Sequence, residues 1–135
     1  ASSMLARAVA RVRREGLDDV LLVRGDALAL PFVDAAFAKL NCSGGLHQMP
    51  DLARALAELA RVAKPGAHFA ASGFAREGAA TGGVRGWLHD RFALHVIPIA
   101  QLAQSIERAG FEQVETRMAG AWFGYASARR PLAGA

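Results

Sequence analysis

The chain alternates helix-length amphipathic segments with strand-length apolar runs, and this alternation constrains the fold more than any other feature. Helical spacing of apolar residues marks residues 4–15, 52–63 and 98–109, and strand-length runs cover residues 19–23, 38–43, 68–74, 113–118 and 121–128. The last two strands are joined by Ala119 and Gly120, a connection short enough to predict an antiparallel hairpin. Strands that alternate with helices need crossover connections. The pattern therefore predicts a three-layer α/β fold, with helices on both faces of a mostly parallel sheet.

Capping and breaking residues support two of these helices. Asp51 is a good N-cap, and the helix behind it should end at Lys64-Pro65-Gly66, because proline cannot continue a helix and glycine turns the chain. Pro98 suits the start of the last helix and Gly110 its end. The stretch "LPFVDAAF", residues 30–37, predicts a turn that includes a short helix.

Composition excludes several classes of protein. A chain of 135 residues can bury one core, and its 53% hydrophobic residues, spread in short runs, exclude a disordered protein. No apolar run reaches about 18 residues, so we expect no membrane partner, and the amphipathic N-terminus does not resemble a signal peptide. The net charge of +4 comes from scattered arginines without interleaved aromatic residues, which favours a solvated surface over a nucleic-acid-binding face. The single cysteine, Cys42, fits a reducing, cytoplasmic location.

Ligands in open α/β sheets lie beyond the carboxyl ends of the strands, so the residues after each strand are the first candidates for a site. Gly25-Asp26-Ala27 follows the predicted strand at residues 19–23. The Asp26 carboxylate can accept from an exocyclic amine while the Ala27 amide donates to a ring nitrogen, which together would recognise the edge of an adenine. The alternative is that Asp26 only orders a turn.

The second strand runs into "NCSGGLHQMPD", where Gly44 and Gly45 would allow a ligand close to the backbone. His47 follows them, and a histidine there can act as a general base or remain a surface or core residue. Cys42 has no neighbouring pattern that would activate a nucleophile, so it is better explained as a small apolar residue at a strand end. The histidines lack metal-ligand spacing, and we expect no metal site.

Three motifs at a particular spacing are more specific than any one of them. "GDALALPFVDAAF" is followed by "NCSGGLHQMPDLARALAELARVAKPGAHFA" and then by "AGFEQVE". Together they resemble the class I S-adenosylmethionine-dependent methyltransferases, and within them the small-molecule group that includes the ubiquinone/menaquinone-type C-methyltransferases. The resemblance runs from Met4 to about Ala128. It implies a Rossmann-like methyltransferase fold and S-adenosylmethionine as cofactor.

The resemblance also implies roles for individual residues. In the turn that begins at Gly25, Asp26 would bind the adenine amino group and the amide of Ala27 would contact the ring. The cofactor-binding residues it implies beyond this turn are Met4, Asn41, Cys42, Ser43 and Leu46. Asn41, Cys42 and Ser43 would line the methionine and sulfonium part. The segment that holds Leu46 and His47 would face the acceptor, with His47 as the candidate catalytic base.

The sequence departs from the family pattern at its N-terminal side. The glycine-rich loop and the acid that holds the ribose would both lie upstream of Ala1, so we expect residues 1–135 to be the C-terminal two-thirds of a single domain. The family's strand order is 3-2-1-4-5-7-6, and residues 19–23 would be strand 3, without the neighbour that satisfies its backbone. A fragment, a partner chain that supplies the gap, and a different pairing all remain open. Residues 76–97 are a candidate lid or substrate loop.

These observations predict methyl transfer from S-adenosylmethionine to a small-molecule acceptor. The alternative is a non-catalytic remnant or interaction module that kept the fold and lost the cofactor. A nucleic-acid methyltransferase would rest on the basic charge alone and is disfavoured. A homodimer remains open.

Overall fold

The structure is a computed structural model that describes residues 2–78 and 96–134. Its helices are α1 (Ser2–Glu15), the 3-10 helix η1 (Leu46–Gln48), α2 (Leu52–Val62) and α4 (Ile99–Arg108). Its strands are β1 (Phe37–Ser43), β2 (Ala63–Arg76), β3 (Ile97–Pro98), β4 (Glu112–Ala119) and β5 (Phe123–Arg129). The expected lid, residues 76–97, falls largely on residues 79–95, which lie outside the described part of the chain.

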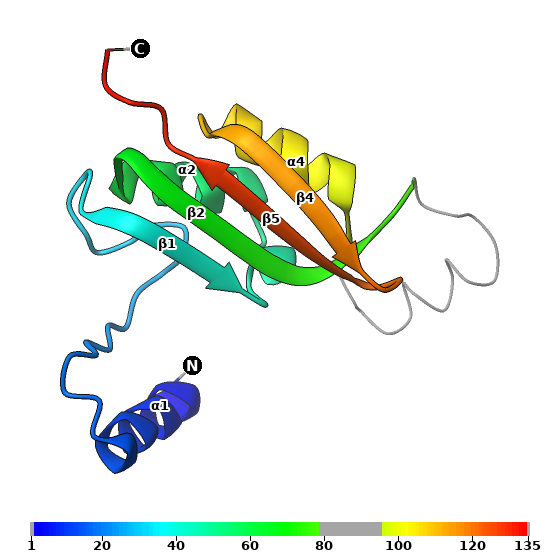
Figure 1. The fold of residues 1–135 in the computed structure, drawn as a ribbon. Helices are drawn as coiled ribbons and strands as arrows, with labels where there is room; N and C mark the ends of the chain where they lie inside the picture. Colours follow the sequence, from blue (N-terminus) through cyan, green and yellow to red (C-terminus); the bar gives the residue numbers. More distant parts are fainter. Residues whose placement is uncertain (1, 79–95, 135) are drawn as a thin grey trace.

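The strands form one twisted sheet in the order β1-β2-β5-β4, with β3 paired to the end of β2 (Figure 1). β1 and β2 are parallel, with Leu40 beside Phe69, while β5 runs antiparallel to both β2 and β4. The predicted hairpin of β4 and β5 is therefore confirmed. The order of these four strands is the 4-5-7-6 half of the arrangement that the family resemblance implies.

The core lies between the sheet and helices α2 and α4, which pack on the same face of it (Figure 1). Phe69 of β2, Leu56 of α2 and Ile106 of α4 are almost completely buried. Asp51 caps α2 as predicted, because its carboxylate accepts from the backbone N–H of Arg54 at 2.9 Å. The periodicity of apolar residues thus identified the buried faces of both helices.

The predicted strand at residues 19–23 is wrong, since these residues form no strand and all but the half-buried Leu22 are exposed, Leu21 by 84%. No neighbouring strand lies beside them in the described part of the chain, and an unpaired strand has no partner for its backbone groups. Helix α1 precedes this segment and lies apart from the sheet (Figure 1). The apolar character of the run was therefore not sufficient to make it a strand, because no strand of the described residues pairs with it.

The short helix expected within residues 30–37 is also wrong. This segment consists of bends and turns that lead into β1. Ala35 adopts a left-handed backbone conformation with φ of 51°, and its N–H donates to the carbonyl oxygen of Arg61 at the end of α2. Contacts with α2, rather than local helical bonds, therefore determine the path of the loop.

Candidate functional site

The carboxyl ends of β1 and β2 bring together three of the predicted cofactor residues. Asn41, Cys42 and Ser43 are the last residues of β1. The Ser43 hydroxyl lies 3.0 Å from the hydroxyl of Ser72 on β2, and the N–H of Gly44 donates to the Ser72 carbonyl at 2.7 Å. This bond ties the glycine turn to β2, so the end of β1 is held in place at the sheet edge where a ligand would approach.

Cys42 is half-buried beneath the glycine turn. A methyl group at Gly45 would come within 3.0 Å of the Cys42 sulfur, which explains why a residue without a side chain follows here. Burial raises the pKa of the Cys42 thiol, although hydrogen bonds from the backbone of Gly45 and Leu46 oppose that shift. A thiol held in its neutral form is a poor nucleophile, which argues against a nucleophilic role for Cys42.

Leu46 and His47 turn inward at η1, where both are buried. The His47 ring lies over Gly73 of β2, so close that a methyl group on Gly73 would be 2.9 Å from its Nδ1. It also packs edge-on against Phe74, with ring centroids 5.3 Å apart, and its Nε2 lies 3.4 Å from the amide nitrogen of Gln48. His47 is thus positioned by packing at the carboxyl end of β2.

The Gly25-Asp26-Ala27 segment forms a tight turn on the surface. One Asp26 carboxylate oxygen, Oδ1, accepts from the N–H of Leu28 at 2.9 Å, and the Asp26 carbonyl accepts from the N–H of Ala29. A methyl group on Gly25 would lie 2.8 Å from Pro31, so the turn closes only with glycine there. Asp26 therefore does order its turn. Its Oδ2 has no hydrogen-bond partner within residues 2–78 and 96–134.

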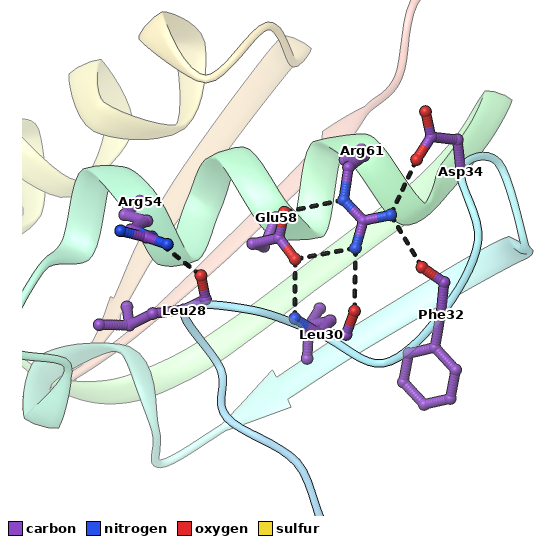
Figure 2. Close-up of polar contacts among 7 residues, drawn as sticks. All are labelled: Leu28, Leu30, Phe32, Asp34, Arg54, Glu58 and Arg61. Carbon is purple, nitrogen blue, oxygen red and sulfur yellow. Dashed lines mark hydrogen bonds and ion pairs between the residues drawn. The ribbon is translucent and has the colours of Figure 1, made fainter.

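An arginine on α2 fixes the loop that follows this turn, and sequence analysis missed it (Figure 2). Arg61 donates to the carbonyl oxygens of Leu30 and Phe32 at 3.0 and 2.8 Å, and to the carboxylate of Asp34 at 2.8 Å. Glu58 holds the same guanidinium through two bonds of 2.7 and 2.8 Å and accepts from the N–H of Leu30 at 2.7 Å. We call these five residues the Arg61 network. The i,i+3 spacing of Glu58 and Arg61 was the available signal, but it did not reveal the loop partners.

The Arg61 network gives Glu58 an acid-sensitive role. The Arg61 side chain, and after it the N–H of Leu30, lower the pKa of Glu58 from 4.5 to about 2. Because the folded pKa is depressed, ionised Glu58 stabilises the fold above pH 4.5, and that contribution is lost as the pH falls towards 2.

We therefore expect Glu58→Gln to reduce the loss of stability between pH 4.5 and 2. Urea unfolding of the intact protein at a series of pH values measures this loss. Glu107→Gln, on the exposed surface of α4, is the matched control and should keep the acid dependence of the wild type. An identical pH dependence in Glu58→Gln and the wild type would contradict the role of this carboxylate.

The first turn of α2 connects the two candidate segments. Arg54 donates to the carbonyl oxygen of Leu28, just after the Asp26 turn, at 3.0 Å (Figure 2). The segment after η1 leads into the same turn of α2 through Asp51. Met4 belongs to α1, which lies apart from the sheet (Figure 1), and its side chain is 74% exposed. Among the described residues, no group of three or more His, Cys, Asp or Glu side chains is placed to hold a metal ion. No helix in that part of the chain is long and apolar enough to cross a membrane.

The strand order and the polar groups at the carboxyl ends of the parallel strands define a Rossmann-like α/β domain. The chain matches the ubiE/COQ5 methyltransferase family over residues 1–108, and it belongs to that family. The resemblance inferred from the three motifs and the Rossmann-like fold it implied are confirmed. Helices were expected on both faces of a mostly parallel sheet, whereas in residues 2–78 and 96–134 the sheet is mixed and α2 and α4 pack on one face of it (Figure 1).

Individual relatives agree with this assignment. The chain is 35% identical over 82 residues to the ubiquinone/menaquinone biosynthesis C-methyltransferase UbiE of Paracoccus denitrificans. The matched segment covers 61% of this chain and 32% of that protein. It thus spans about a third or less of the length of the curated relatives it matches. Among solved structures, a phosphoethanolamine N-methyltransferase of Haemonchus contortus in complex with S-adenosyl-L-methionine has a TM-score of 0.82 at 14% identity, covering 97% of this chain and 42% of that one.

The cyclase SpnF has the same fold, with a TM-score of 0.83 and 21% identity over 98% of this chain and 65% of that one. A shared fold does not determine a reaction, because function depends on the site that the fold carries. The family match and the site residues, rather than the overall likeness, therefore carry the functional argument.

Proposed function

We propose that the protein to which this chain belongs transfers a methyl group from S-adenosylmethionine to a small-molecule acceptor. The match to the ubiE/COQ5 family over residues 1–108 is the observation that carries the proposal. The names of two relatives, a ubiquinone/menaquinone biosynthesis C-methyltransferase and a demethylmenaquinone methyltransferase, support a carbon atom of a quinone-type acceptor. A cytoplasmic location is part of the proposal, and a small molecule rather than nucleic acid is its acceptor.

The Asp26 turn fits the adenine end of this cofactor. Asp26 is exposed, and Leu28 holds one carboxylate oxygen while the other is left to accept from an exocyclic amine. The amide of Ala27 would donate to the ring, and Gly25 lets the turn close against Pro31. The turn-ordering role of Asp26 therefore supports its ligand role, because a carboxylate held by one oxygen presents the other in a fixed direction.

The end of β1 fits the methionine end. Asn41, Cys42 and Ser43 lie at the sheet edge, and Leu46 closes the turn behind them. When bound, the cofactor supplies an electrophilic methyl group on a sulfonium. The protein's own contribution is to hold the acceptor in line with that methyl group. The raised pKa of the Cys42 thiol keeps it neutral, so Cys42 does not provide a competing thiolate.

His47 is the proposed general base for an acceptor that loses a proton as it gains the methyl group. It lies at the carboxyl end of β2, next to the glycine turn after β1. Met4 on α1 would complete the methionine site only if α1 lies closer to β1 in the assembled protein than it does here.

Asp26→Asn should weaken binding of S-adenosylhomocysteine to the intact protein. The substitution replaces one carboxylate oxygen with an amide nitrogen that cannot accept, at a cost on the order of 1–3 kcal/mol. Titration calorimetry measures the change in affinity, and it also tests whether the wild type binds this ligand at all. Asp18→Asn, an exposed carboxylate in the same linker, is the control and should bind like the wild type. Equal affinity in Asp26→Asn and the wild type would remove Asp26 from the adenine site.

A further inference from the structure

We propose that Arg61 and Glu58 are positioning residues for adenine recognition, acting through the loop that carries Asp26. This inference rests on the proposed function and extends it to two side chains of α2. Neither residue belongs to the cofactor-binding set that the sequence predicted. The Arg61 network supplies the observations for the inference (Figure 2).

The loop that follows the Asp26 turn has no regular structure of its own. Residues 28–34 form neither helix nor strand, and few backbone bonds within the loop determine its path. Its polar backbone groups instead bind side chains from α2, at Leu28, Leu30 and Phe32. The carbonyl oxygens of residues 28, 30 and 32 all accept hydrogen bonds from α2, so the loop has a defined position relative to that helix.

The contacts from α2 reach Asp26 itself. Leu28 donates its N–H to Oδ1 of Asp26 at 2.9 Å, and its carbonyl accepts from Arg54 at 3.0 Å. Two residues further on, Leu30 is held on both sides, because its N–H donates to Glu58 and its carbonyl accepts from Arg61. The direction of the Asp26 carboxylate is therefore set by a chain of hydrogen bonds that begins on α2.

The number and geometry of its donors suit an arginine to position 61. A guanidinium has five N–H donors in a planar fork, so Arg61 can bind Glu58, Asp34 and two loop carbonyls at once. The same bonds to Glu58 and Asp34 raise the pKa of Arg61, so it remains charged. A lysine would have three donors on one nitrogen and could not serve all of these acceptors together.

The test uses the intact protein and two ligands, S-adenosylhomocysteine and its analogue in which hypoxanthine replaces adenine. The analogue lacks the exocyclic amine that Asp26 would recognise. We expect Arg61→Gln to weaken S-adenosylhomocysteine binding by roughly tenfold, about 1.4 kcal/mol, and to change binding of the analogue far less. A role in overall stability would instead affect both ligands equally. Arg108→Gln, an exposed arginine on α4, is the matched control.

Two further measurements keep the inference falsifiable if Arg61→Gln folds poorly. Arg54→Gln removes one exposed contact to Leu28 and should show the same ligand preference to a smaller degree. Hydrogen exchange of the amides of residues 26–34, without ligand, should be faster in both variants than in Arg108→Gln. A double variant of Arg61→Gln and Asp26→Asn should bind no more weakly than the weaker single variant, because the two substitutions remove one interaction.

The outcomes separate this inference from the proposed function. If the wild type binds neither ligand, the proposed function is wrong and the inference with it. If the wild type binds S-adenosylhomocysteine and Arg61→Gln loses both ligands equally, or neither, adenine positioning by Arg61 is wrong while the proposed function stands. Unchanged amide exchange in residues 26–34 also overturns the inference.

Discussion

Phe69→Ala should lower the free energy of unfolding by about 3–5 kcal/mol, the cost of removing a buried phenylalanine ring. Phe69 is 1% exposed and lies at the centre of the sheet, on β2, between β1 and β5. Its ring stacks on Phe111, with centroids 5.1 Å apart and planes at 28°. Loss of the ring leaves a cavity between β2 and the helices, which α2 and α4 cannot fill without moving away from the sheet.

Chemical denaturation of the intact protein measures this effect. Phe37→Ala is the matched control, because Phe37 is 36% exposed at the start of β1 and contacts the ring of Phe32. We expect the control to lose less than half as much stability as Phe69→Ala. Equal losses in the two variants would mean that the core is not centred on β2.

Helices and the hairpin were predictable because their signals are local. Leu56 of α2 and Ile106 of α4 lie on apolar faces that recur at helical spacing, and Asp51 is visible as a cap next to them. The β4–β5 hairpin needs a turn of few residues, so sequence neighbours decide its pairing. The run at residues 19–23 had the same apolar character, but a strand exists only with a neighbour, which no local pattern can supply.

The candidate site likewise contains residues whose placement could be predicted from the sequence and residues whose placement could not. The placement of residues at or just after strand ends, such as Ser43 and His47, could be predicted because topology alone brings the carboxyl ends of parallel strands together. The Arg61 network joins residues 27 to 31 positions apart through a loop without periodicity. Arginine on a predicted helix is normally solvated, so nothing in the sequence distinguished Arg61 from the other arginines.

The network also changes how the Asp26 turn is understood. Sequence analysis set a turn-ordering role for Asp26 against a ligand-binding role. The structure shows that one oxygen orders the turn through Leu28 while the other has no partner in the described part of the chain. The two roles are compatible, because a recognition group works best when its orientation is fixed before the ligand arrives.

His47→Asn should lower kcat for methyl transfer by about 10²–10⁴-fold, the usual contribution of a general base, with little change in the affinity for S-adenosylhomocysteine. The side chain is 8% exposed and its ring position is set by Gly73 and Phe74. Asparagine keeps a polar group of similar size but cannot take up a proton at neutral pH. Steady-state kinetics with a quinone-type acceptor measures the rate, and calorimetry measures the affinity.

A second variant tests the same histidine without replacing it. Gly73→Ala would place a methyl group 2.9 Å from Nδ1 of His47, so the ring must shift, and the rate should fall while the cofactor affinity stays. His68→Asn is the matched control, because His68 lies five residues before Gly73 on β2, is exposed, and has its Nε2 3.4 Å from a guanidinium nitrogen of Arg129. The space between His47 and Leu102 of α4 measures only about 10 Å³, which is too little for an acceptor. Unchanged rates in both His47→Asn and Gly73→Ala would make His47 a packing residue and leave the proton to another group.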